Sequence, residues 1–271
     1  MILRRLSKHV KDQNWFAVGL DFLIVVLGVF IGLQVQQWSE RRATDQRTAM
    51  LMERLEADFG VDVWVAKSLH EYHQQVLRHA QMMLDDLTGR ETLPDDALLI
   101  AAHRASQFNR FNRTSGIYEE LVASGGLELV SSSDVGVIAT LFYKTTILDD
   151  YEQDGKSSEY RQLYRSRTPI DVQAAVDAQC GDRARTVGQM ISGDSVIGYP
   201  CTLDFPADRL AEAAAILRQE PALRPALRLR IATLATQNRD FGTIVEAMSP
   251  YAADRNTVEK SSLGVVFGVP E

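Results

Sequence analysis

The chain has 271 residues, a formal net charge of −7 and 45% hydrophobic residues. Because the chain is acidic, it lacks the basic surface that binds nucleic-acid phosphates, and a nucleic-acid partner is not expected. Charged and apolar residues are well mixed, which excludes disorder for most of the chain. The length suffices for one sizeable hydrophobic core or two small ones.

The first fourteen residues are basic and are expected to lie in the cytoplasm. Apolar side chains fall at helical spacing opposite the cations, which suits an amphipathic helix on an anionic leaflet. The cations are Arg4, Arg5, Lys8 and Lys11, and the apolar residues are Ile2, Leu3, Leu6 and Val10. Charge that only orients the following helix in the membrane explains the same residues equally well, and the two interpretations are compatible.

Residues 15–38 form a long apolar stretch that is predicted to be a transmembrane helix. A helix of this length spans about 36 Å, more than the roughly 30 Å hydrocarbon core of a bilayer. Trp15, Phe16 and Trp38 bracket the stretch, as aromatic residues do at membrane interfaces. A cleavable signal peptide would be shorter and followed by small residues, whereas this stretch ends in Gln-Val-Gln-Gln-Trp. A buried core helix would show a polar face, and residues 22–33 have none.

One face of the apolar stretch carries an acid and two glycines. At 100° per residue, five positions form one stripe, which we term the association face: Asp21, Val25, Gly28, Gly32 and Val35. A carboxylate at the bilayer centre costs ~2.5–3.5 kcal/mol on insertion scales, so Asp21 needs a partner, a proton or a thinner bilayer. Gly28 and Gly32 are spaced for close helix approach. The association face is therefore expected to contact a second copy of the chain or a partner membrane protein, although such glycine pairs also arise by chance.

The basic residues on either side of the stretch predict its orientation. Four cations precede it closely, and three follow it: Arg41, Arg42 and Arg47. The positive-inside rule counts Lys and Arg, so this small bias favours a cytoplasmic N-terminus. The domain formed by residues 39–255 is then expected on the other side of the membrane, in the periplasm.

The chain has two cysteines, Cys180 and Cys201, which bracket a segment rich in Gly, Ser and Pro. A disulfide that closes a loop of this length contributes up to about 3 kcal/mol of stability. Disulfides form in oxidising compartments, so a Cys180–Cys201 bridge in a periplasmic domain is predicted. The alternative is two unrelated buried thiols in a cytosolic domain. A zinc site would need two more ligands nearby.

Helical periodicity and helix-end signals run through the rest of the chain, without strand alternation of useful length. The predicted fold is all-α: one transmembrane helix followed by a bundle of long antiparallel helices that share one core. Residues 256–271 are expected to be a flexible tail. The helices of the domain are expected near residues 39–87, 93–108, 117–124, 134–166, 204–219 and 227–248.

Two segments resemble a bacterial family of uncharacterised single-span membrane proteins, a domain of unknown function. The first runs from Asp21 to Glu40, and the second, within residues 117–130, reads Tyr-x-x-Leu-x-x-Ser-Gly-x-Leu-x-Leu. The resemblance covers roughly residues 1–150 and implies a helical protein anchored in the bacterial inner membrane, with no activity attached. Three features depart from the family pattern: an aspartate rather than a glutamate in the anchor, the cysteine-bounded segment, and Pro221 and Pro225.

The second of these segments has an architectural interpretation and a functional one. Tyr118 and Leu121 lie on one helix face, Gly125 or Gly126 ends the helix, and such apolar positions are usually core. The alternative is a groove for a ligand or partner, with Arg113, Tyr118 and Ser124 as its polar lining.

No catalytic residue, metal or cofactor is predicted. His70, Glu71 and His73 fall one residue short of the His-Glu-x-x-His zinc pattern, and a third ligand is not evident, so a solvated helix face explains them better. Helix capping explains the serines at 131–133 better than a nucleophile does. Helix-end charge is the simplest reason for three acid pairs: Asp85–Asp86, Asp95–Asp96 and Asp149–Asp150.

The sequence therefore predicts a non-enzymatic, membrane-anchored interaction or scaffold module. About fourteen cytoplasmic residues are too few for a signalling domain, so a sensing role would need a membrane partner. The first alternative is a periplasmic small-ligand sensor or binding subunit that acts through such a partner. A periplasmic hydrolase is the third possibility, and converging polar groups in a deep pocket would favour either alternative.

Overall fold

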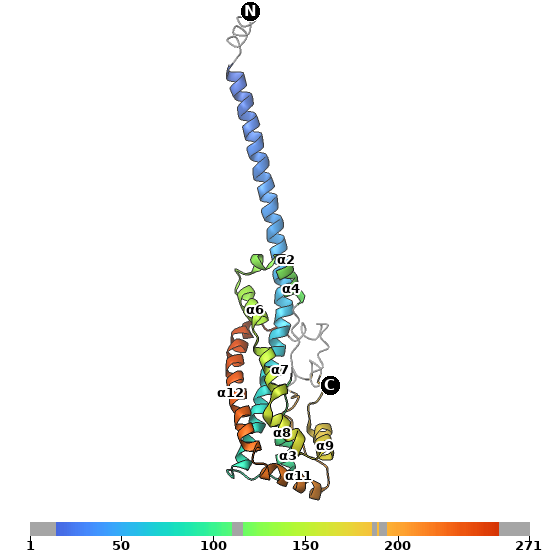
Figure 1. Cartoon of the computed structure of the whole chain (residues 1–271). Helices are drawn as coiled ribbons and strands as arrows, with labels where there is room; N and C mark the ends of the chain where they lie inside the picture. The colour runs from blue at the N-terminus through green and yellow to red at the C-terminus, as the bar shows by residue number, and fades with distance from the viewer. Residues whose placement is uncertain (1–14, 110–115, 186–188, 190–193, 255–271) are drawn as a thin grey trace, which may run out of the picture. The chain divides into compact units, whose positions relative to one another are not determined.

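The computed structural model describes residues 15–109, 116–185, 189 and 194–254 (Figure 1). Over these residues the protein is helical and contains no strand, which confirms the all-α prediction. The expected amphipathic segment 1–14 and the expected tail 256–271 lie outside the described residues. The chain divides into two compact units, Met1–Leu51 and Met52–Glu271, and each is considered by itself.

The described part of the first unit belongs to helix α2, which runs from Trp15 to Leu87. Among the described residues, one helix is long and apolar enough to span a membrane, and it is this one. The most apolar 18-residue window of α2 has a mean hydropathy of 2.4, and none of that window is buried within the chain. The apolar stretch is thus part of one continuous helix, and its side chains from residue 18 onwards are exposed.

The second unit is built from the remainder of α2 and a set of mostly short helices (Figure 1). α11 packs against α3, α12 against α7 and α8, and α3 also against α9. In chain order the helices are α3 (Asp95–Ala105), α4 (Gly116–Ala123), α5 (Leu127–Val130), α6 (Asp134–Lys144), α7 (Ile147–Ser157), α8 (Glu159–Arg167), α9 (Ile170–Cys180), α11 (Ala207–Gln219), α12 (Leu223–Met248) and the 3-10 turn η1 (Ser249–Tyr251).

α12 runs antiparallel to α2. Side chains from successive points of α12 reach successively earlier points of α2: Arg224 donates to the Leu87 carbonyl at 2.5 Å, and Asn238 donates to the His73 carbonyl at 3.3 Å. The prediction of long antiparallel helices therefore holds for α2 and α12, with 73 and 26 residues. In the part of the chain that the structure describes, the other α-helices whose bounds are given above have 4 to 13 residues.

The single helix expected over residues 134–166 is wrong, because the structure divides it into α6, α7 and α8. Thr145 adopts an extended conformation after α6. Ser158 ends α7 and caps α8, since its hydroxyl accepts a hydrogen bond from the Arg161 amide. A side-chain cap such as that of Ser158 satisfies backbone groups without continuing the helix. The chain can therefore change direction between the three short helices.

Other predicted helix ends agree with the structure. The Ser133 hydroxyl caps α6 by accepting from the Gly136 amide, and Gly89 and Gly125 adopt positive φ angles of 69° and 70° where α2 and α4 end. The stretch 127–130, between the helices expected at 117–124 and 134–166, forms the single turn α5. The expected start of the last helix near residue 227 is wrong, because α12 begins at Leu223 and includes Pro225. Pro225 is tolerated in the first turn, where an amide hydrogen would have no helical acceptor.

Most of the core lies at the end of the bundle where α2 meets α3. It contains apolar residues from α2, α3, α8, α9, α11 and α12, among them Met83, Leu98, Tyr160, Val176 and Leu217. A smaller cluster joins α2 and α12 to the segment before Cys201, through Val76, Leu234 and Ile197. The cysteine-bounded segment therefore packs on the bundle, which places the polar groups described below.

Candidate functional site

The predicted association face is exposed along the first unit. Val25 and Val35 are 63% and 58% exposed. A Cβ atom built on Gly28 or Gly32 would have no neighbour within 4 Å, and Asp21 is also exposed. The five residues thus lie on an exposed helix surface, and the association itself remains a prediction.

The predicted groove residues are placed in different surroundings. Tyr118 is buried and stacks on Tyr143 with ring centroids 4.7 Å apart. Tyr143 in turn donates a 2.7 Å hydrogen bond to Asp62 in α2. Ser124 is exposed and accepts a 3.4 Å hydrogen bond from the Gly126 amide. Arg113 lies outside the described residues. Of the two predicted groove residues that the structure describes, Tyr118 contributes to packing within the bundle and Ser124 does not.

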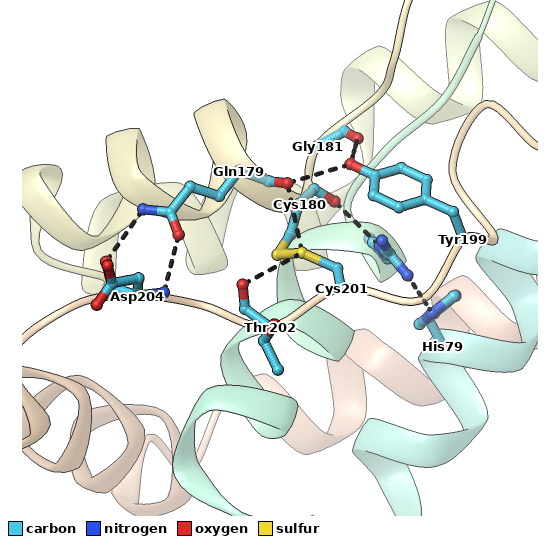
Figure 2. Close-up of a disulfide and its surroundings, with 9 residues drawn as sticks. His79, Gln179, Cys180, Gly181, Tyr199, Cys201, Thr202 and Asp204 are labelled. Carbon is cyan, nitrogen blue, oxygen red and sulfur yellow. Dashed lines mark hydrogen bonds between the residues drawn. A yellow bond between two sulfur atoms is a disulfide. The ribbon is translucent and has the colours of Figure 1, made fainter.

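Cys180 and Cys201 lie at disulfide-bonding distance, with their Cα atoms 5.7 Å apart. Cys180 is buried at the end of α9, and Cys201 is partly exposed. We term the residues around this pair, 179–183 and 196–204, the disulfide corner. Figure 2 shows how it is held: Gln179 hydrogen-bonds to the amide and the carbonyl of Asp204, at 2.8 and 3.1 Å.

A second layer of hydrogen bonds holds the disulfide corner together. The Tyr199 hydroxyl donates to the Gly181 carbonyl at 2.7 Å, and the Arg183 amide donates to the Val196 carbonyl at 3.0 Å. The corner is therefore a cross-linked irregular segment.

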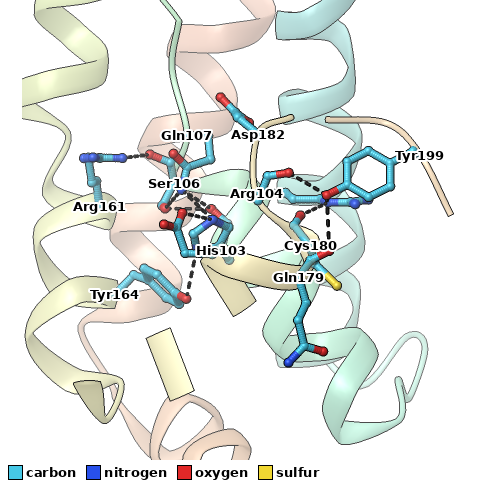
Figure 3. Close-up of polar contacts among 12 residues, drawn as sticks. His103, Arg104, Ser106, Gln107, Arg161, Tyr164, Gln179, Cys180, Asp182 and Tyr199 are labelled. Carbon is cyan, nitrogen blue, oxygen red and sulfur yellow. Dashed lines mark hydrogen bonds and ion pairs between the residues drawn. The ribbon is translucent and has the colours of Figure 1, made fainter. Parts of the chain in front are cut away.

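Arg104 of α3 connects the disulfide corner to the bundle (Figure 3). The side chain is buried, Nε donates to the Cys180 carbonyl at 3.1 Å, and Nη1 lies 3.3 Å from Nε2 of His79. Its guanidinium also lies over the Tyr199 ring, 4.6 Å from the centroid. Burial lowers the pKa of Arg104 from its ordinary value. An arginine in this position fixes the end of α9 through a backbone acceptor.

Asp182 extends from the disulfide corner towards α2. Its Oδ2 accepts a 2.7 Å hydrogen bond from the Tyr72 hydroxyl. Its Oδ1 is enclosed and, among the described residues, has no hydrogen-bond partner. Burial raises the pKa of the Asp182 carboxyl to about 6, because the ionised form loses its hydration. Burial also raises the pKa of Tyr72, and the neighbouring Asp182 adds to that shift.

Three further side chains join α3, α8 and α9 beside Arg104. Nε2 of His103 lies 3.4 Å from a carboxylate oxygen of Asp177, and Nδ1 lies 3.4 Å from the Tyr164 hydroxyl (Figure 3). The hydrogen bond from His103 lowers the pKa of Asp177. This Asp-His-Tyr order is found in proton-transfer sites, but Tyr164 is 1% exposed, so a substrate could not reach it. The three residues instead tie three helices together.

The solvated helix face expected for the His70-Glu71-x-His73 run is wrong for its histidines, because His73 is buried and His70 is half-buried, and only Glu71 of the three is exposed. Nε2 of His70 lies 2.8 Å from Gln74, whereas His73 is fully buried, bonds the Leu69 carbonyl through Nδ1 and stacks on Tyr151. Burial lowers the pKa of His73 to about 3. In the part of the chain that the structure describes, no group of three or more His, Cys, Asp or Glu side chains is placed to hold a metal ion.

Sequence reasoning identified the cysteines but missed the polar residues around them. Asp182 and Tyr199 each lie two residues from a cysteine, and this proximity is the one sequence signal by which they could have been found. Their partners, Tyr72 and Arg104, are 110 and 95 positions away from them in the chain. A pairing over such separations has no periodic pattern that a single sequence would reveal.

Comparisons of the chain with protein-family models, with curated proteins and with solved structures find no match. The resemblance to the family of single-span membrane proteins therefore stays a prediction. The described fold defines an all-helical protein with one exposed apolar helix that is long enough to span a membrane.

Proposed function

We propose that this protein is a non-enzymatic, membrane-anchored interaction module of the bacterial inner membrane. The observation that carries the proposal is the exposure of the apolar part of α2: an 18-residue window with a mean hydropathy of 2.4 has no buried residue. An apolar surface of this extent is unfavourable in water, because each buried Å² of apolar area contributes about 25 cal/mol. A lipid bilayer covers it fully.

The association face supports an interaction role within the membrane. Asp21 shares its face with Gly28 and Gly32, and an intramembrane carboxylate is stabilised when it faces a polar or basic group rather than lipid. A Cβ at either glycine has free space around it, so another helix backbone is able to approach closely there. We propose that the face binds a second copy of the chain or a partner membrane protein.

A periplasmic location for the helical domain fits two features. The small excess of Lys and Arg before the apolar stretch favours a cytoplasmic N-terminus. The Cys180–Cys201 pair, positioned for a disulfide, fits an oxidising compartment.

A role as a small-ligand sensor or binding subunit, the alternative expected from the sequence, is less well supported. It would need polar groups that converge on a pocket. In the described residues the converging groups hydrogen-bond to one another and to backbone carbonyls, as Arg104 does with the Cys180 carbonyl and Tyr199 with the Gly181 carbonyl. These contacts indicate that the polar groups hold the bundle together.

The test is site-specific photocrosslinking of the full chain in native membranes. A photoreactive residue replaces Val25, on the association face, and in a matched control replaces Leu23, which lies on the opposite side of the helix. We expect membrane-bound chain in both cases and a crosslinked product from position 25 only. The mass of the product separates a second copy from a different protein.

A second pair of variants tests the glycines on the face. Gly28→Leu is expected to reduce the crosslinked product from position 25 several-fold, because the added side chain prevents close helix approach. Gly19→Leu is the control, since Gly19 lies opposite the association face and also has free space around it. Equal crosslinking from positions 25 and 23, or recovery of the unprocessed chain in the aqueous fraction, contradicts the proposal.

A further inference from the structure

The junction between the disulfide corner and the bundle contains two complementary polar atoms that are both enclosed. Oδ1 of Asp182 is an acceptor and Nη2 of Arg104 is a donor, and among the described residues neither has a hydrogen-bond partner. The other polar atoms of these two side chains have partners: Tyr72 donates to Oδ2 of Asp182, Nε of Arg104 donates to the Cys180 carbonyl, and Nη1 of Arg104 lies 3.3 Å from Nε2 of His79.

Charged and titratable groups face Asp182 from each helix that packs against it. They are Tyr72 on α2, Arg104 on α3, Arg161 on α8 and Asp177 on α9. Arg230 on α12 acts on Tyr72 and so on the same cluster. Arg104 and Arg161 favour the ionised carboxylate, whereas Asp177 and desolvation favour the neutral carboxyl. The balance of these effects decides the protonation state of Asp182.

Asp182 is fixed in the bundle by contacts on both sides of it, so a change in its protonation affects the segment around it. It follows Cys180 by two residues, so it is held in the bundle by the disulfide, by the Tyr199–Gly181 bond and by its own bond to Tyr72. An ionised carboxylate with an oxygen that accepts no hydrogen bond is costly inside a protein. Solvating that oxygen requires residues 181–183 to move outwards.

We propose that the Asp182 carboxyl is a proton-responsive latch, which holds the disulfide corner against α2 and α3 when it is neutral and loosens the corner when it is ionised. This inference does not depend on membrane anchoring. Burial outweighs the nearby arginines and raises the pKa of the carboxyl to about 6, so the latch opens as the pH rises through that value. The cross-link between Cys180 and Cys201 keeps the loosened corner attached to the end of α9.

The experiment measures hydrogen exchange of the full chain in bilayer nanodiscs from pH 4.5 to pH 7, with labelling times scaled to the intrinsic exchange rate. The carboxyl has a pKa of 3.8 when free and about 6 in the closed corner. Linkage then predicts that the opening equilibrium of residues 180–185 and 196–200 rises about twentyfold over this range. Asp182→Asn cannot ionise and is expected to show no rise.

Two further variants make the outcome decisive. Asp204→Asn removes an exposed carboxyl from the same corner while keeping its backbone contacts with Gln179, and it is expected to behave like the unaltered protein. Tyr72→Phe removes the hydrogen bond that favours the ionised carboxylate, so its opening midpoint is expected at higher pH. Should Asp182→Asn fail to fold, the direction of the Tyr72→Phe shift decides.

Three results would overturn the latch. They are protection of the corner that does not change between pH 4.5 and pH 7, an Asp182→Asn protein that retains the full pH dependence, and a Tyr72→Phe midpoint that is unchanged or lower.

Discussion

The hydroxyl of Tyr199 donates a 2.7 Å hydrogen bond to the carbonyl oxygen of Gly181, directly beside the Cys180–Cys201 pair. Gly181 follows Cys180 by one position and Tyr199 precedes Cys201 by two, so the hydrogen bond and the disulfide join the same two segments of the chain. The Tyr199 ring also covers the guanidinium of Arg104, which bonds the Cys180 carbonyl. The disulfide corner is therefore joined both to itself and to α3.

Removal of the disulfide is expected to lower the free energy of unfolding of the bundle by about 3 kcal/mol, the value for closing a loop of roughly twenty residues. The variant is Cys180→Ala with Cys201→Ala, which avoids leaving a hydroxyl in the core, because Cys180 is fully buried. Chemical denaturation of the full chain in detergent micelles measures the change. A reducing agent should lower the stability of the unaltered protein by a similar amount and leave that of the double variant unchanged. If the disulfide does not form, the reducing agent will change the stability of neither protein.

The features that local pattern determines were predictable from the sequence. The apolar stretch 15–38 needs nothing beyond hydropathy and length, and α2 includes it as a continuous exposed helix. The cap at Ser133 and the glycine stops at Gly89 and Gly125 depend on neighbouring residues only. The cysteine pair followed from composition, since the chain has two cysteines.

Features that depend on distant contacts were not predictable. Thr145 and Ser158 are compatible with a helix by pattern, and packing against the rest of the bundle decides that they end α6 and α7. The bond from Tyr72 to Asp182 joins residues 110 positions apart. Asp182 looked like an ordinary loop acid in the sequence, and its burial became evident only when α2, α3 and α9 were placed around it.

Gly60 is expected to be intolerant of alanine, although alanine usually stabilises a helix interior by about 1 kcal/mol relative to glycine. A methyl group there would lie 2.9 Å from the Ala253 amide nitrogen and 3.0 Å from the Tyr251 carbonyl oxygen. Both are backbone atoms, and the Ala253 amide donates to the Gly60 carbonyl at 2.9 Å. We expect Gly60→Ala to lose about 1–2 kcal/mol net, because that hydrogen bond and its packing are disrupted.

The Gly60→Ala measurement combines denaturation of the full chain with hydrogen exchange at Ala253, which should become faster. Gly116→Ala is a suitable control, since a Cβ at Gly116 has free space around it. A Gly60→Ala protein that is more stable than the original would mean that residues 251–253 do not pack on α2 as described.

Arg104→Lys is expected to destabilise the bundle by about 1.5–3 kcal/mol even though the charge is kept. Lysine cannot donate from the Nε position to the Cys180 carbonyl while its head lies over the Tyr199 ring. The thermal midpoint of the full chain in micelles reports the loss. Arg78→Lys is the matched control on α2, because Arg78 is exposed and makes one 3.2 Å bond to Gln75. Equal effects from the two variants would rule out a structural role specific to Arg104.

His73 and Asp182 are expected to respond to acid in opposite directions. Burial lowers the pKa of His73 from 6.5 to about 3. The contribution of neutral His73 to the free energy of unfolding is therefore full above pH 6.5 and is lost as the pH falls towards 3. Burial raises the pKa of Asp182 from 3.8 to about 6, so its contribution is full below pH 3.8 and is lost as the pH rises through 6. Between pH 4.5 and pH 6 the two contributions partly cancel.

His73→Phe separates the two contributions, because phenylalanine cannot take up a proton and keeps a ring to stack on Tyr151. At pH 7 the variant should lie within about 1 kcal/mol of the unaltered protein, since one local hydrogen bond to the Leu69 carbonyl is lost. On acidification from pH 7 to pH 4.5 it should lose about 2.5 kcal/mol less stability than the unaltered protein. Asp182→Asn should do the reverse and make the acid loss larger. Denaturation midpoints across this range measure both, and parallel curves for the unaltered protein and His73→Phe would mean that His73 is not held neutral in the folded bundle.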